Sequence, residues 1–119
     1  MMGLLLFVAQ LAAADTTFAQ AKSLADEYEA AVSPRDKAAL VEAQQKALDK
    51  AIAACGPIKG APPPFTIVAH VAQNGVTDRT WRSGDSALAQ CFDQQLRAVV
   101  LPMAAGKAFY ASYELSFAP

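Results

Sequence analysis

The chain has 119 residues, of which 54% are hydrophobic and 18% charged, and its formal net charge is −1. This length suits one domain, and the hydrophobic fraction excludes an intrinsically disordered chain. The near-neutral charge argues against a nucleic-acid-binding protein and against a polybasic membrane-binding surface. One histidine and two cysteines leave few ligands for a metal ion and few partners for a nucleophile, so residue chemistry alone does not indicate an activity.

The first 14 residues have most features of an export signal. Residues 4–14 read LLLFVAQLAAA, an apolar run of signal-peptide length that is too short to span a bilayer. Ala12 and Ala14 fit a cleavage site before Asp15, but the first positive charge, Lys22, follows this site instead of preceding the apolar run. We therefore predict a signal peptide over residues 1–14 and a periplasmic or secreted mature protein. The alternative is that this segment is a helix of the mature fold.

Two helices are predicted over residues 15–56. Apolar residues recur at helical spacing from residue 17 to residue 32 and again from residue 34 to about residue 55. Ser33 is a good N-cap, Pro34 suits the first helical position, and Asp36 completes a box-like cap. Gly56 is expected to end the second helix. Its charged face is most simply a solvated one.

A proline-rich connector, residues 57–64, precedes a segment that reads strand, strand, helix, strand. Residues 65–73 alternate apolar and polar, Asn74-Gly75 is a strong hairpin signal, and residues 76–82 form the return strand, in which a bulge is possible. Ser86 lies where a helix begins, and the apolar stripe of that helix continues to Val100, before Pro102 and Gly106. Residues 109–117 alternate again and form the last strand.

These elements predict an α+β fold with a ββαβ unit over residues 65–119. The hairpin pairs the first two strands antiparallel, and a right-handed helical crossover places the third strand beside the first. The sheet is then three-stranded, antiparallel or mixed, with strand order 2-1-3 and a free edge at the C-terminal strand. We expect the N-terminal helical segment to pack on the sheet and the helices to share one of its faces.

Cys55 and Cys91 lie on the apolar stripes of two helices that are expected to share a sheet face. In an exported chain such a pair predicts a disulfide bond. Closing a loop of about 36 residues would stabilise the fold by roughly 4 kcal/mol in the chain-entropy model. The alternative is a pair of buried, unlinked thiols.

Short motifs in the second half resemble a known family. They are VAQNG at Val71–Gly75, Ser-Gly-Asp at Ser83–Asp85, a cysteine in the following helix, Pro102 with Gly106, and the aromatic-ended last strand. Together they resemble the C-terminal domain of TonB and its relatives, nearest the gliding-motility variant called the AgmX/PglI C-terminal type. That variant tends to carry a second cysteine in the preceding helix, which Cys55 would match.

The resemblance implies a binding function at the sheet edge. TonB-type domains capture an extended receptor segment along their open third strand, and strand addition needs only main-chain N–H and C=O groups. Here the proline run is three residues long, and the Tyr-Pro pair that precedes the family's first strand is absent. Of the activities that the resemblance implies, we therefore expect only the capture of an extended segment by the edge strand in this chain. The side chains expected to contact a protein or peptide of the cell envelope are the outward set Tyr110, Ser112, Glu114 and Ser116.

Other readings of the chemistry remain as alternatives. His70, the single imidazole, is expected as an exposed sheet residue on the face away from the helices, and Asp78 and Asp85 are expected to be separate turn and cap residues. Trp81, between Arg79 and Arg82, would be the anchor of an exported inhibitor or immunity protein that blocks a partner enzyme, although its sheet face is left open. We expect no enzymatic activity, cofactor, metal or nucleic-acid partner, and a monomer or homodimer.

Overall fold

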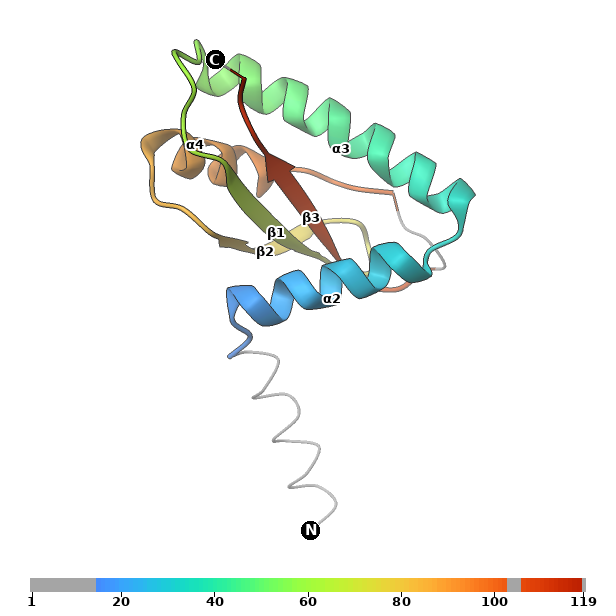
Figure 1. The fold of residues 1–119 in the computed structure, drawn as a ribbon. Coiled ribbons are helices and arrows are strands. Elements are labelled where there is room, and N and C mark those ends of the chain that lie inside the picture. Colours follow the sequence, from blue (N-terminus) through green and yellow to red (C-terminus); the bar gives the residue numbers. More distant parts are fainter. Residues whose placement is uncertain (1–14, 103–105, 119) are drawn as a thin grey trace.

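The computed structural model describes residues 15–102 and 106–118, so the predicted signal peptide at residues 1–14 lies outside the described residues. The described chain is α+β, as predicted, with three helices and one three-stranded sheet (Figure 1). The helices are α2 (Phe18–Ala31), α3 (Pro34–Cys55) and α4 (Ala87–Leu96), and the strands are β1 (Phe65–Val71), β2 (Thr77–Arg82) and β3 (Phe109–Leu115). No helix of the described part is both long enough and apolar enough to cross a membrane.

Local signals set the helix starts. Thr17 and Gln20 form a reciprocal capping box at α2. Ser33 accepts the main-chain N–H of Asp36, with proline in the first turn of α3, and Ser86 caps α4 in the same way. The predicted bounds of α3 are confirmed, because a cap and a terminating glycine enclose an unbroken helical pattern.

The sheet has the strand order β2-β1-β3, as expected. Both neighbours of β1 run antiparallel to it; His70 faces Arg79 on one side and Tyr110 on the other. A register shift lies between His70 and Val71, close to the hairpin turn. Beyond this shift, alternate residues of β2 face opposite sides of the sheet, and Trp81 lies opposite Val68.

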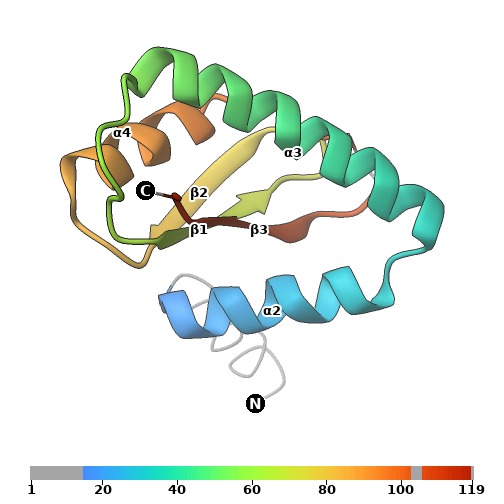
Figure 2. The ribbon, with the colours of Figure 1, turned by 45° about the horizontal axis from the view of Figure 1, so that its top comes forward.

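Helices α3 and α4 cover one face of the sheet and form the larger core with it (Figure 2). Ile67 and Tyr113 lie in this core, as does Phe92 of α4. The Cys55–Cys91 disulfide is formed, with 5.9 Å between the Cα atoms. It joins the end of α3 to the middle of α4, which confirms the predicted pairing.

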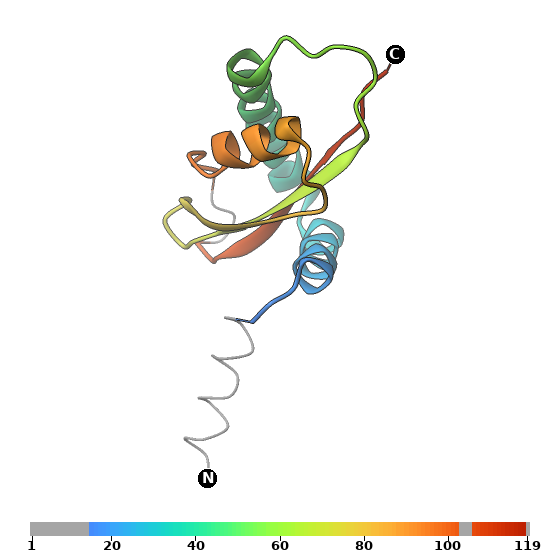
Figure 3. The same ribbon diagram turned by 90° about the vertical axis from the view of Figure 1, so that its left-hand side faces the viewer.

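Helix α2 lies on the opposite face, which differs from the expectation that the helices share one face. Figures 2 and 3 show the sheet between α2 and the other two helices. Ala21 and Ala25 of α2 pack on Val68, which is fully buried, and Trp81 and Tyr110 pack against this smaller cluster. The physical reason is that Val68, Trp81 and Tyr110 together present apolar surface on this second face, and the alanines of α2 cover it.

The end of α4 is a second correction. The apolar spacing predicted a helix to about Val100, but α4 ends at Leu96 and the chain turns back toward the hairpin. Val100 forms a bridge with Val76, and the N–H of Leu101 donates to the carbonyl of Gly75 at 2.9 Å. Gly75 has φ +87°, and a Cβ there would lie 2.5 Å from the Leu101 oxygen. Glycine is therefore required at this crossing.

Candidate functional site

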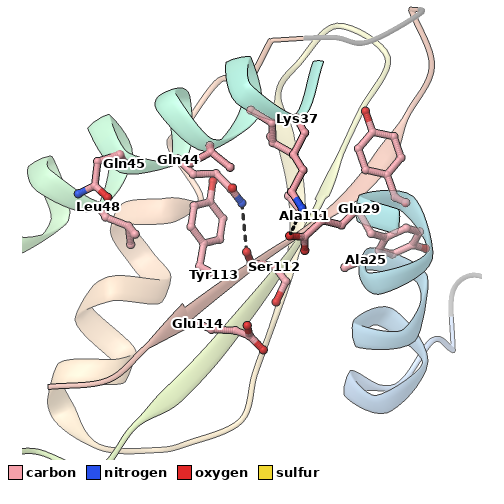
Figure 4. A pocket seen from close by; sticks show the side chains of 14 residues that line it. Ala25, Glu29, Lys37, Gln44, Gln45, Leu48, Ala111, Ser112, Tyr113 and Glu114 are labelled. Carbon is pink, nitrogen blue, oxygen red and sulfur yellow. Dashed lines mark hydrogen bonds and ion pairs between the residues drawn. The ribbon is translucent and has the colours of Figure 1, made fainter. Parts of the chain in front are cut away.

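The exposed edge of β3 lies at the bottom of a groove between α2 and α3. Helix α2 approaches the strand from one face of the sheet and α3 from the other, and the strand edge lies between them (Figure 4). The groove encloses a volume of about 230 Å³. The edge that the sequence predicted to be free is therefore accessible only between two helices.

The main chain of β3 presents hydrogen-bonding groups to this groove. The carbonyl of Ser112 accepts a hydrogen bond from Nε2 of Gln44 in α3, at 3.1 Å, and so points away from β1. In an antiparallel pair, alternate residues direct both main-chain groups away from the neighbouring strand. Tyr110, Ser112 and Glu114 are thus the positions whose N–H and C=O groups face the groove.

The two walls differ in chemistry. The α3 wall is mixed and has an exposed Val41 side chain. Its apolar residues are Leu40, Val41 and Leu48, and its polar ones are Lys37, Gln44 and Gln45. The α2 wall carries Tyr28 and Glu29. The groove thus offers apolar and polar surface on the α3 side, and an aromatic and a charged side chain on the α2 side.

Two ion pairs connect the groove elements. Glu29 of α2 and Lys37 of α3 are 3.5 Å apart and join the helices across one end of the groove (Figure 4). Lys22 of α2 bonds Asp26 and lies 3.2 Å from Glu114 of β3. The hydrogen bond to Asp26, together with Glu114, raises the pKa of Lys22 against the opposing effect of burial. Both pairs are at least partly exposed to solvent, so their contribution to stability is small.

Two buried hydroxyls on the groove floor have no hydrogen-bond partner among the described residues: Ser112 Oγ and Tyr113 OH. Ser112 lies opposite Val68, on the α2 face, and Tyr113 lies opposite Ile67, on the α3 face. Burial raises the pKa of Tyr113 well above its usual value. Its hydroxyl is therefore neutral at physiological pH and is able both to donate and to accept a hydrogen bond.

The structure groups part of the predicted binding set. Tyr110, Ser112 and Glu114 all line the groove, although Tyr110 also packs against Trp81, with 5.8 Å between the ring centroids. Ser116 lies just beyond the end of β3, in a neighbouring hollow. Trp81 lies elsewhere and does not line the groove.

Trp81 contacts the residues that lead into α2. Its ring N–H donates to the carbonyl of Thr16 at 2.8 Å, and the guanidinium of Arg79 lies 4.5 Å from the ring centroid. Arg82 points to the other face, where it bonds Asp93 at 2.6 Å. Only Arg79 therefore lies beside the indole, since neighbouring strand positions face opposite sides of a sheet.

His70 also differs from expectation. Its side chain is half-buried on the face that α2 covers, Nδ1 lies 2.7 Å from Asp78 Oδ1, and its ring meets Tyr110 edge-on. Asp85 instead pairs with Arg82 at 3.2 Å. The two aspartates are thus separate, as expected, and each has a partner of its own.

The sequence reasoning missed two polar residues. Asp93 is 3% exposed and bonds Arg82, Arg97 and Thr80, a network that joins α4 to β2. Burial lowers the pKa of Arg82, but its hydrogen bonds to Asp93 and Asp85 outweigh this effect, so the pKa is raised. The second missed residue is Gln44. Its position could have indicated it, because it lies four residues from both Leu40 and Leu48, on the face of α3 that turns toward the sheet.

No protein-family model matches the chain, and neither a curated protein nor a solved structure matches it. Among the described residues, histidine, cysteine, aspartate and glutamate form no group of three that could hold a metal ion.

Proposed function

We propose that this protein is a non-enzymatic binding module of the cell envelope that takes up an extended polypeptide segment by strand addition to β3. The observation that carries the proposal is the row of main-chain groups at the bottom of the groove, centred on the Ser112 carbonyl. Extended segments bind such edges through main-chain hydrogen bonds, and side-chain pockets supply specificity.

Binding requires one exchange of partners. The Ser112 carbonyl already accepts the Gln44 amide, so an incoming N–H must replace it. One neutral hydrogen bond contributes about 1 kcal/mol net, and the new bond offsets the lost one. Side chains of the bound segment would then point alternately to the α2 and α3 walls.

Several features support an exported location. A disulfide bond persists in oxidising compartments such as the periplasm, and the pair Cys55–Cys91 is bonded here. The signal-like residues 1–14 and the resemblance to the TonB C-terminal domain point to the same compartment. A periplasmic protein or peptide is therefore the proposed partner class.

The test uses a random linear peptide library displayed on phage, selected on the purified, disulfide-bonded protein. Glu114→Pro removes a main-chain N–H that faces the groove and leaves the bonds to β1 in place. We expect the selected peptides to bind this variant about tenfold more weakly, because one hydrogen bond is lost and a peptide carbonyl is left without its partner.

Glu114→Ala is the matched control, since it removes the same side chain and its contact with Lys22 but keeps the N–H. It should bind the peptides as the wild type does. Undiminished binding to a folded Glu114→Pro protein would contradict strand addition at this edge.

The alternative, an inhibitor that blocks an enzyme through Trp81, has a separate test. Trp81 is half-buried and its ring N–H is used within the fold, which leaves less of it for a partner. Under that alternative, Trp81→Ala would abolish partner binding and Glu114→Pro would not.

A further inference from the structure

We propose that the groove selects segments with two adjacent hydrogen-bonding side chains, one contacting the Ser112 hydroxyl and the other the Tyr113 hydroxyl. The ligand class is an extended peptide with a short hydroxyl side chain next to a longer, uncharged amide side chain. This inference rests on the proposed function and specifies its ligand.

The hydroxyls of Ser112 and Tyr113 are both buried and without a partner among the described residues. Buried polar groups in folded proteins nearly always have a hydrogen-bond partner, so each exception calls for an explanation. Both exceptions among the described residues, Ser112 Oγ and Tyr113 OH, belong to consecutive residues of β3. Both residues line the same groove, and Tyr113 is only 2% exposed. A ligand in this groove is the partner that the two hydroxyls share.

The pleat of β3 directs the two hydroxyls to opposite sides of the groove. Ser112 and Tyr113 present their side chains to opposite faces, Ser112 toward α2 and Tyr113 toward α3. Consecutive residues of an added strand also alternate between these faces. Two adjacent ligand residues therefore match the two hydroxyls, one on each side of the new strand.

The positions of the two hydroxyls set the size and the charge of the ligand side chains that can contact them. The Ser112 hydroxyl is close to its own main chain, so a serine or threonine side chain reaches it. The Tyr113 hydroxyl lies at the far end of a ring that extends toward α3 and Gln44 (Figure 4), so a longer side chain such as glutamine or asparagine is needed. A charged side chain would lose hydration in this buried position.

Gln44 adds to the same wall. When a ligand N–H takes the Ser112 carbonyl, the Gln44 amide is released on the α3 side of the groove. It then becomes a further polar group for the longer ligand side chain. The rest of the α3 wall is formed by Leu40, Val41 and Leu48 together with Lys37 and Gln45.

The experiment compares the peptides that the displayed library yields on the wild type, on Ser112→Ala and on Tyr113→Phe. Peptides that Glu114→Pro still binds are discarded, because they do not use the groove. We expect the wild-type peptides to share an adjacent pair of hydroxyl and amide residues. Each variant should lose the preference at one position and keep it at the other.

A double-mutant cycle on one selected peptide makes the assignment specific. Replacing the peptide threonine by valine should weaken binding to the wild type about fivefold, the effect of one neutral hydrogen bond, and should have no effect with Ser112→Ala. The same pattern is expected for the amide residue and Tyr113→Phe. Thermal unfolding followed by circular dichroism verifies that both variants are folded.

The outcomes separate the two proposals. Groove-dependent peptides without a shared polar pair, or with a pair that both variants still prefer, would overturn this inference and leave strand addition standing. A library that yields no peptide sensitive to Glu114→Pro would overturn the proposed function, and the inference with it.

Discussion

At the β2 edge, main-chain bonds close the start of the strand: Thr77 donates to the Val99 carbonyl and Leu101 to the Gly75 carbonyl. At the β3 edge, by contrast, the Ser112 carbonyl is met by a side chain, that of Gln44. A main-chain closure cannot open without refolding the segment, whereas a glutamine changes rotamer rapidly. An unpaired strand edge can pair with another strand, so the β3 edge is suited to exchange, whereas the start of β2 is closed by main-chain bonds.

The largest effect is expected from the disulfide, because it ties the helix that covers the β3 edge to the helix that leads into the β2 closure. Replacing Cys55 and Cys91 by alanine should lower the free energy of unfolding by roughly 4 kcal/mol, measured by urea denaturation. Chemical reduction of the wild type should give a similar loss. A loss below about 1 kcal/mol would mean that core packing alone holds the two helices.

The β2 closure is broken by Gly75→Ala. A Cβ would lie 2.5 Å from the Leu101 oxygen at a residue with positive φ, and we expect a destabilisation of about 3 kcal/mol. Gly60→Ala is the matched control: φ is also positive, at +68°, but nothing lies within 4 Å of the added Cβ. It should cost about 1 kcal/mol. Equal losses in the two variants would show that the close approach to Leu101 is unimportant.

The hydrogen bond from Gln44 to the Ser112 carbonyl at the β3 edge is tested by Gln44→Leu. Removing the amide frees the Ser112 carbonyl for a ligand, so groove-binding peptides should bind about fivefold more tightly, while stability changes by less than about 1 kcal/mol. Gln45→Leu is the control, since Gln45 is exposed and bonds Asp49 instead. Weaker binding to Gln44→Leu would mean that the contact of the released amide with the ligand side chain outweighs the gain from the freed carbonyl.

The smallest effect is a pH dependence at the groove floor. Because the pKa of Tyr113 is raised in the folded protein, its contribution to stability is complete below pH 10, the unfolded value, and is lost as the pH rises further. Tyr113→Phe should remove about 1 kcal/mol of the stability loss between pH 8 and pH 11, measured by urea denaturation. Identical pH profiles would show that the hydroxyl ionises freely in the folded state.

Much of the fold followed from local patterns. The cap at Ser33 and Pro34 and the glycine after Cys55 predicted α3 correctly, and the turn at Asn74-Gly75 with alternating residues predicted the strand order. The end of α4 was wrong because Val99 and Val100 fit a helical stripe locally, whereas pairing with the hairpin satisfies their main-chain groups.

The sequence by itself determined the apolar faces of β1 and β3, the strand that forms the free edge, and the pairing of Cys55 with Cys91, because period, caps and chain order encode these features. Only the tertiary structure decided that α2 covers the second face and that the edge lies in a groove. It also brought Gln44 to Ser112, 68 residues away along the chain, and left the hydroxyl of Tyr113 without a partner among the described residues. The physical reason is that periodicity shows which face of an element is apolar but not which other element covers that face.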